Sequence, residues 1–192
     1  MKYLIIALLS YLLGSFPFGY YIGKYAYKKD IRTMGSGNIG TTNALRNFGK
    51  IAGLATFALD FLKGFIACLI GNKIAGTNGM TIAMLFVVLG HMYSFILKFK
   101  GGKGIATVFG ALVYINPTFA LCMFGVFLVI VLISRMVSLG SVCVCLVAIV
   151  VSLIKFGFTY FSISLSILAI IIVIKHRTNI KRIINGKESK LF

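Results

Sequence analysis

The sequence predicts an all-α integral membrane protein, a polytopic helical bundle with about seven transmembrane helices. Of its 192 residues, 59% are hydrophobic, and the mean hydropathy of +1.01 lies far above the range of soluble domains. The apolar residues gather into runs close to the ~20 residues that cross a bilayer as a helix. The charged residues fall in short segments between those runs. Together these observations exclude a soluble globular domain.

The candidate spans follow one another with no internal repeat and no soluble domain between them. They are residues 3–23, 51–71, 80–97, 105–115, 117–134, 137–155 and 157–174. The run at 105–115 is short, and a five-span arrangement that merges or omits two short runs satisfies most of the same charges. The first run lacks a signal-peptide cleavage site, so we interpret it as a span. We therefore expect a single transmembrane domain over residues 1–192.

The distribution of Lys and Arg predicts the orientation. The chain holds 20 Lys and Arg against three Asp and Glu, a net charge of +17. With seven spans and the N-terminus outside, each crowded cationic segment and the C-terminus lie in the cytoplasm. This excess of positive charge indicates anionic partners, either membrane lipids or a phosphorylated substrate. Because the cations are confined between apolar runs, nucleic acid is not an expected partner.

Three polar segments, at 33–50, 98–107 and 175–188, are therefore expected on one face of the membrane, where they can meet. In the first, Gly35, Gly37 and Gly40 permit positive φ, so that successive amides can form an anion-binding nest. Side-chain donors surround these glycines: Ser36, Asn38, Thr41, Thr42, Asn43 and Arg46. A short helical turn before 51–71 would face the same anion. The alternative is a flexible polar loop in which Arg46 only satisfies the positive-inside rule.

The second segment, KFKGGKGIAT at 98–107, places Lys103 among Gly101, Gly102 and Gly104, directly before an apolar helix. A flexible cation at the start of a helix is suited to phosphate. The segment lacks the Walker A spacing and an acidic residue for Mg²⁺, so nucleotide hydrolysis is not predicted.

The third segment begins where the last span ends. His176 and Asn179 are three residues apart and are expected to share a helix face at the membrane surface. The alternative is that His176 is only an interfacial residue. Ser141, in the 137–155 run, lies near the expected cytoplasmic side and can reach the same pocket.

Polar residues within the spans are expected to support structure. Asp60 and Lys63 stand at i and i+3 and are predicted to neutralise each other. His91 is predicted to pack or to form a supporting hydrogen bond. The four cysteines lie in apolar runs without metal-ligand spacing, so we expect packing roles, no metal and no cofactor.

The residue types narrow the chemistry. The sequence contains no carboxylate dyad, no nucleophile elbow and no polar Cys/His pair. Neither histidine is followed five residues later by Asp, since position 96 is Ile and position 181 is Lys, which excludes the H-x-x-x-x-D pattern of CoA-dependent glycerolipid acyltransferases. A site of donors and cations stabilises negative charge. It suits a substrate that arrives activated and leaves as phosphate, such as an acyl phosphate.

At these segments the sequence resembles the bacterial acyl-phosphate:glycerol-3-phosphate acyltransferases, the PlsY family. The matching motifs are GSGNIGTTNALRNFG at 35–49, KGGKGIAT at 100–107 and HRTNIKRIINGKE at 176–188, with DFLKG at 60–64 and GHMYS at 90–94. The resemblance implies acyl transfer from acyl phosphate to the 1-hydroxyl of glycerol 3-phosphate, giving lysophosphatidic acid and phosphate, the first acylation of phospholipid synthesis. It further implies a multi-pass protein of the bacterial cytoplasmic membrane whose active site faces the cytoplasm.

The resemblance also carries residue roles. It implies catalytic roles for Ser36, Arg46, Lys103, His176 and Asn179, with the loop glycines and Ser141 binding substrate. The family usually has proline where this chain has Ile39, which predicts a looser first loop. The hydroxyl proton passes either to His176 or to a substrate phosphate oxygen, and the shortage of acids favours the substrate.

Two other classes of protein remain alternatives at this stage. An anion or organophosphate carrier would use the same cationic loops as a gate, and a non-catalytic lipid-binding component would explain the charge but not the glycine-rich loops. No obligate protein partner is expected.

Overall fold

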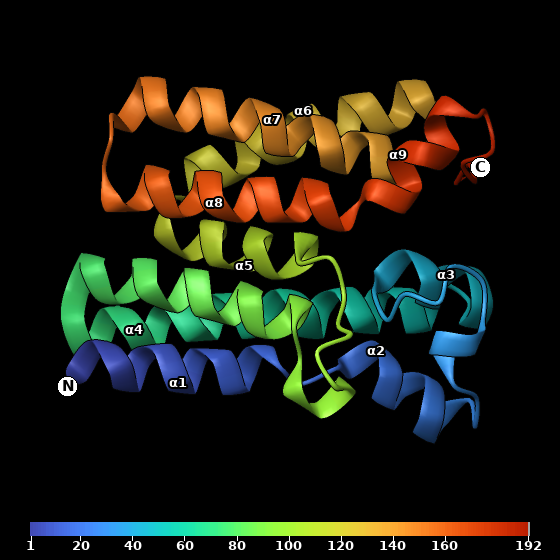
Figure 1. The fold of residues 1–192 in the computed structure, drawn as a ribbon, viewed down its shortest axis with the longest axis horizontal. Coiled ribbons are helices and arrows are strands. Elements are labelled where there is room, and N and C mark those ends of the chain that lie inside the picture. Colours follow the sequence, from blue (N-terminus) through green and yellow to red (C-terminus); the bar gives the residue numbers. More distant parts are fainter. Residues whose placement is uncertain (192) are drawn as a thin grey trace. The chain divides into compact units, whose positions relative to one another are not determined.

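The computed structural model describes residues 1–191, which contain helices and no strand, and it confirms the predicted all-α class. The chain divides into two compact units, Met1–Ile115 and Asn116–Phe192, and each is described by itself (Figure 1). The prediction of a single domain is not tested by this division.

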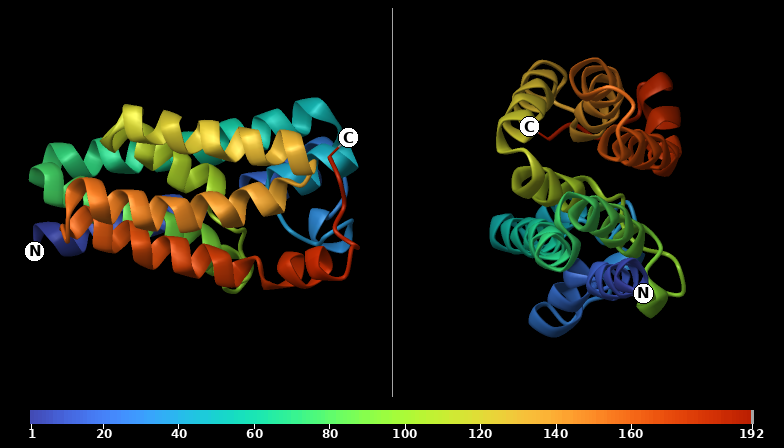
Figure 2. Two further views of the ribbon diagram at one scale, coloured as in Figure 1. Left: turned by 90° about the horizontal axis from the view of Figure 1, so that it is seen from above. Right: turned by 90° about the vertical axis from the view of Figure 1, so that its left-hand side faces the viewer.

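The first unit is built around α4. Its elements are α1 (Lys2–Gly14), α2 (Phe18–Tyr21), a π-helical turn (Ile22–Ala26), a 3₁₀ turn (Ile31–Thr33), α3 (Thr41–Phe48), α4 (Lys50–Met92), a second 3₁₀ turn (Phe95–Leu97) and α5 (Ile105–Ile115). Helices α1, α3 and α5 all pack against α4. The end-on view in Figure 2 (right) shows α1 beside the two arms of α4.

Helix α4 is a helical hairpin. Ala75 (φ −147°, ψ 26°) and Gly76 (φ 57°, ψ −145°) leave the helical conformation. Gly71 and Gly79, on either side of this turn, approach so closely that a Cβ on either would overlap the carbonyl oxygen of the other. Because glycine alone permits this approach, the arms 50–74 and 77–92 pack against each other. They correspond to the predicted runs at 51–71 and 80–97.

The second unit contains α6 (Pro117–Ser134), α7 (Val137–Phe156), α8 (Tyr160–Lys175) and α9 (Arg177–Ile184). Helix α7 packs against both α6 and α8. The side chain of Asn116 accepts a hydrogen bond from the amide of Phe119 and so caps α6, whose first residue is proline. Thr159 and Ser162 form a capping box at the start of α8. These local signals explain why the helices begin near the predicted boundaries.

Four stretches of the described chain are long and apolar enough to cross a membrane, namely Lys2–Ala26, Lys50–Leu97, Pro117–Ser134 and Val137–Phe156. The bent pair α8 and α9 qualifies as a fifth, with 56° between its helices, while α5 is shorter. A straight helix over Lys50–Leu97 would be ~72 Å long, more than twice the ~30 Å hydrocarbon thickness, and the hairpin in α4 divides this length between two arms. The seven-span count and the orientation stay predictions.

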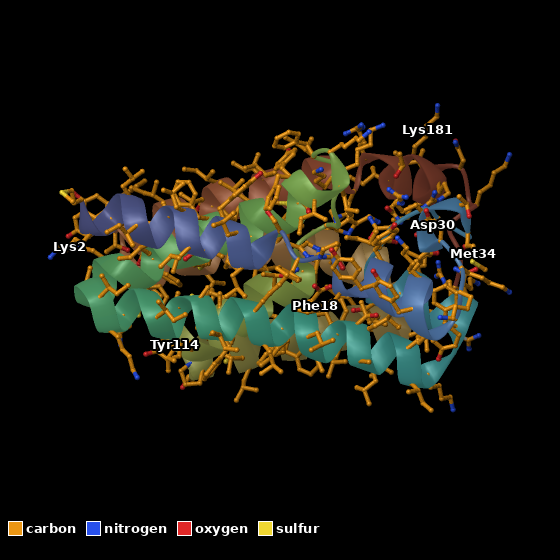
Figure 3. The ribbon with its side chains drawn as sticks, turned by 90° about the horizontal axis from the view of Figure 1, so that it is seen from below. Lys2, Phe18, Asp30, Met34, Tyr114 and Lys181 are labelled. Carbon is orange, nitrogen blue, oxygen red and sulfur yellow. The ribbon has the colours of Figure 1, made fainter. Side chains whose placement is uncertain are left out.

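The polar segment after the first span lies at one end of the first unit. Figure 3 shows Lys2 at the opposite end of this unit from Asp30 and Met34, with Phe18 between them. The first run is interrupted between these ends, because α1 stops at Gly14 and Pro17 precedes α2.

Candidate functional site

The first polar segment folds around the buried side chain of Asn43. Its Nδ2 donates to three carbonyl oxygens, and its Oδ1 accepts from two N–H groups. The acceptors are Ile31, Met34 and Asn38 at 3.2, 3.0 and 2.8 Å, and the donors are the Ser36 amide at 3.0 Å and Asn47 Nδ2 at 2.9 Å. Since both hydrogens of the amide are engaged within the loop, we assign Asn43 to holding the loop, where the sequence had predicted substrate binding.

Several amides of the predicted nest donate within the loop itself. The amide of Gly37 donates to Met34 O at 2.9 Å, and that of Gly40 donates to Asn38 Oδ1 at 2.9 Å. The Asn38 amide lies 3.4 Å from Ser36 Oγ. The positive φ values expected of the glycines are present, 55° at Gly35 and 70° at Gly37. These glycines therefore shape the turn and leave the donor role to neighbouring groups.

The predicted short helix is confirmed as α3, and it supplies those donors. No side chain caps its N-terminus, so the amides of Thr41 and Thr42 are the first-turn donors that an anion can satisfy. Arg46 lies exposed on the same helix, and Ser36 is exposed on the loop before it. The first segment thus presents hydroxyl, amide and guanidinium donors from a rigid loop and helix.

The second polar segment lies against the end of α4. The amides of Gly101 and Gly102 donate to the carbonyl oxygens of Met92 and His91 at 3.3 and 3.0 Å, which satisfies acceptors left open at the helix end. A Cβ on Gly101 would overlap the His91 carbonyl oxygen. Lys103 is half-buried and is followed by Gly104, with φ 88°, at the start of α5.

One hydrophobic cluster joins the first two segments. Ile39 and Ala44 from the first segment, and Ile31 just before it, pack with Leu97, which directly precedes the second segment. Tyr20 and Phe48 complete the cluster. Ile39 is only 3% exposed, so it fills a buried position in a loop that its side chain anchors. The structure thus brings the first two predicted segments together within the first unit.

The third segment belongs to the second unit. His176 is buried at the bend between α8 and α9, and its Nδ1 lies 2.8 Å from Ile172 O. A carbonyl only accepts, so Nδ1 carries the hydrogen and Nε2 holds the lone pair in the neutral ring. In this tautomer Nε2 of His176 accepts hydrogen bonds and does not donate them.

Asn179 is bound to a carboxylate that the sequence analysis missed. Asn179 Nδ2, Ser138 Oγ and Arg182 Nε donate to the Glu188 carboxylate at 2.6, 2.8 and 2.7 Å. Burial would raise the pKa of this carboxyl, but the hydrogen bonds from Arg182, Asn179 and Ser138 outweigh it and hold the pKa below its usual value. The sequence did offer one signal for this site, because Glu188 is the only acid among the cations of the C-terminal segment. The Glu188 cluster, defined by these four residues, fixes the C-terminal segment on α7.

Ser141 is buried in α7, and its hydroxyl donates to Val137 O at 2.8 Å. The only hydrogen of this hydroxyl is therefore used within the helix. Ser141 keeps only its oxygen lone pairs for any further contact, which narrows its predicted role to that of an acceptor.

The predicted pairing of Asp60 with Lys63 is confirmed, with 2.7 Å between Oδ1 and Nζ. Lys63 Nζ also lies 2.8 Å from Nδ1 of His91, on the other arm of α4. The expected supporting hydrogen bond of His91 is thus present. Among residues 1–191, no three His, Cys, Asp or Glu side chains are grouped to hold a metal ion.

Known proteins resemble the chain along nearly its whole length. The family model described as glycerol-3-phosphate acyltransferase matches residues 4–186. A glycerol-3-phosphate acyltransferase of Carboxydothermus hydrogenoformans is 46% identical over 189 residues, covering 98% of this chain and 96% of that protein. One from Finegoldia magna is 44% identical over 195 residues, covering 100% and 98%.

Two crystal structures of PlsY (YgiH), described as an integral membrane glycerol 3-phosphate acyltransferase, share the fold. The glycerol 3-phosphate form has a TM-score of 0.93 at 39% identity, covering 99% of this chain and 96% of that one. The lysophosphatidic acid form has a TM-score of 0.90 at 38% identity, covering 99% and 95%.

Proposed function

The chain belongs to the glycerol-3-phosphate acyltransferase family, and we propose that its acyl donor is an acyl phosphate. It is an integral membrane acyltransferase related in fold to PlsY. In the proposed reaction a fatty acyl group moves to the 1-hydroxyl of glycerol 3-phosphate, which yields lysophosphatidic acid and inorganic phosphate. This is the first acylation of phospholipid synthesis.

The observation that carries the choice of donor is the pair of glycine-rich segments joined by one hydrophobic cluster. Their side chains and helix starts offer hydrogen-bond donors and cations, from Ser36, Thr41, Thr42, Arg46 and Lys103. Such groups hold phosphates and stabilise the negative charge that develops during acyl transfer. A mixed anhydride is already activated, so positioning supplies much of the catalysis.

The proposed step balances without a covalent enzyme intermediate. The glycerol 1-oxygen attacks the acyl carbonyl carbon and forms the ester bond, while the bond from that carbon to the phosphate oxygen breaks. The hydroxyl proton moves to a phosphate oxygen of the substrate, which is favoured because acids are scarce, or to Nε2 of His176. Phosphate departs with the electron pair of the broken bond.

We assign roles by the chemistry of each group. Arg46, as a planar fork, and Lys103, as a point charge, hold the substrate phosphates. Ser36, Thr41 and Thr42 add donors in the first segment. In the second unit, His176 orients the hydroxyl through Nε2. Asn179, which the Glu188 carboxylate holds in place, also orients the substrate. The enzyme is further proposed to lie in the bacterial cytoplasmic membrane, with seven spans and these segments on the cytoplasmic side.

The test is phosphate release from palmitoyl phosphate by the purified protein in detergent, with and without glycerol 3-phosphate. Palmitoyl-CoA is offered as the competing donor, and lysophosphatidic acid is followed as product. We expect phosphate release that requires glycerol 3-phosphate, with no product from the CoA ester. Product from palmitoyl-CoA but not from palmitoyl phosphate would overturn the proposed donor. Movement of unaltered glycerol 3-phosphate into liposomes, without product, would instead indicate a carrier.

A further inference from the structure

We propose that Asp60, Lys63 and His91 form a buried positioning cluster that fixes the backbone of the second glycine-rich segment and thereby places Lys103. The inference rests on the proposed function in one respect, because it takes that segment to bind a substrate phosphate. None of the three residues touches the substrate in this proposal. They are positioning residues, and they act through Gly101 and Gly102.

The ammonium group of Lys63 stands at the centre of the cluster. Its side chain is 1% exposed, and that of Asp60 is 3% exposed. An ammonium has three hydrogens and no lone pair, and three acceptors lie within 3.0 Å of Nζ: Asp60 Oδ1 at 2.7 Å, His91 Nδ1 at 2.8 Å and Phe16 O at 3.0 Å. The Asp60 contact is an ion pair and is not aligned as a hydrogen bond. Lys63 therefore joins both arms of α4 to the chain just after α1, at Phe16.

The contact with Lys63 fixes the state of His91. The same Nδ1 also lies 3.4 Å from Asp60 Oδ1, but the ammonium contact is shorter, at 2.8 Å. Because the ammonium only donates, we assign Nδ1 of His91 as the acceptor and place the hydrogen of the neutral ring on Nε2. Nε2 points toward Gly102, where it takes the space that a Cβ on that residue would fill. The ring and the loop backbone are thus in close contact on the side opposite Lys63.

The backbone of His91 holds the same loop. Its carbonyl oxygen accepts from the amide of Gly102 at 3.0 Å, and a Cβ on Gly101 would overlap that carbonyl. Lys98 and Phe99 have φ values of 51° and 63°, a left-handed conformation that is costly for residues with side chains. Such strain persists where the surroundings determine it. The Phe99 amide donates to Ser94 O at 2.8 Å, and the contacts of Gly101 and Gly102 with His91 hold the chain directly after it. Both sets of contacts constrain this part of the loop.

A substrate contact made through this loop depends on its placement. Loosening the cluster is therefore expected to weaken glycerol 3-phosphate binding more than turnover, because the cluster makes no contact with the reacting atoms. This split between KM and kcat separates a positioning role from a purely structural one.

The first test replaces both charges, with Asp60→Leu and Lys63→Leu in one variant. Swapping a buried ion pair for apolar side chains of similar volume often preserves stability. Phe16 O and His91 Nδ1 lose their donor, so the thermal midpoint in detergent is expected to fall modestly while the protein stays folded. We expect KM for glycerol 3-phosphate to rise about tenfold, kcat to change less than threefold, and amides of residues 98–107 to exchange faster without substrate. The matched control is Thr81→Val, an isosteric change on the same arm, ~15 Å from His91 along the helix.

A second test remains decisive if the double variant does not fold. Gly102→Ala is expected to raise KM about tenfold in the parent, because the new methyl meets the His91 ring. In a His91→Ala background the ring is absent, so the same substitution is expected to change KM less than threefold. Effects of Gly102→Ala that are equal in the two backgrounds would overturn the proposal. So would a folded double variant with unchanged KM and unchanged exchange.

The amide exchange readout needs no turnover. If the parent protein fails to release phosphate from palmitoyl phosphate, the proposed donor is wrong, but faster exchange of residues 98–107 in the double variant still supports the positioning cluster. If the parent is active and exchange is unchanged, the proposed function stands and the cluster proposal falls.

Discussion

Each unit of the chain buries one carboxylate, and the two are neutralised in different ways. Asp60 lies inside α4, with the Lys63 ammonium 2.7 Å and the His91 ring 3.4 Å from its Oδ1. Glu188 follows α9, and its charge is shared among Arg182 and two neutral donors, Asn179 and Ser138. Asp60 therefore depends mainly on one cation, with the His91 ring 3.4 Å away, whereas the Glu188 charge is held by one cation and two neutral donors. The same loss of charge is expected to cost more at Asp60.

The largest effect is expected for Asp60→Asn. It leaves the Lys63 ammonium buried without its counter-charge, and removing one partner of a buried pair costs about 3–5 kcal/mol. The loss is measured by thermal unfolding in detergent and by the yield of folded protein. The double Leu variant described above is the control, because it removes the cation as well. Equal thermal midpoints for Asp60→Asn and the parent would contradict this contrast.

A smaller loss is expected for Glu188→Gln. The amide keeps one acceptor oxygen but loses the charge that faces Arg182, which costs about 1.5–3 kcal/mol for hydrogen bonds to a charged group. Chemical or thermal unfolding of the second unit's helices reports it. If Glu188→Gln lowered the free energy of unfolding as much as Asp60→Asn, the proposal that several partners share the stabilisation of Glu188 would be wrong.

The Glu188 contribution is also expected to depend on pH. Its pKa in the folded protein lies below the usual value of 4.5. A lowered pKa stabilises the fold fully above pH 4.5, and that stabilisation disappears as the pH falls through the lower folded-state value. The difference in thermal midpoint between the parent and Glu188→Gln should therefore shrink below pH 4.5. A difference that stays constant down to pH 3 would show that the charge of Glu188 does not stabilise the fold.

Ser138→Ala tests one neutral donor of the Glu188 cluster. One lost hydrogen bond to the carboxylate is expected to cost about 1 kcal/mol, because Arg182 and Asn179 remain. Ser166→Ala is the matched control, since its hydroxyl donates only to a carbonyl within α8. If Ser138→Ala lowered the stability no more than Ser166→Ala, the hydrogen bond from Ser138 to Glu188 would not stabilise the fold.

The smallest effect is expected for the third acid of the chain. Asp30 pairs with Arg32 at 2.6 Å, but the two side chains are 34% and 44% exposed. Exposed ion pairs contribute about 0–1 kcal/mol and are screened by salt. Asp30→Asn should therefore leave the thermal midpoint nearly unchanged, and any difference should vanish in 1 M salt. A loss of stability as large as that of Glu188→Gln would show that exposure does not determine how much these carboxylates stabilise the protein.

Local patterns in the sequence predicted most of the helices. Apolar runs gave the two arms of α4 and the extent of α5, since burial in lipid needs only composition and length. The i, i+3 spacing gave the Asp60–Lys63 pair. The break at Pro17, by contrast, was overlooked in a run that composition alone treats as continuous.

Contacts between distant residues escaped prediction. His91 lies 28 residues from Lys63 and meets it only because α4 folds back at Gly76. The hydrogen bonds of Asn43 within the first loop could not be predicted either, because a carboxamide can bind a ligand or a backbone carbonyl equally well. Glu188 was missed because its partners lie up to 50 residues away in the chain.

The most direct test of the account is hydrogen exchange of the full-length protein with and without glycerol 3-phosphate. The central claim is that the two glycine-rich segments of the first unit bind the substrate phosphates. It predicts slower exchange at residues 34–48 and 98–107 when glycerol 3-phosphate saturates the enzyme, with the far turn around Gly76 unchanged. Protection elsewhere, with none in these two segments, would contradict it.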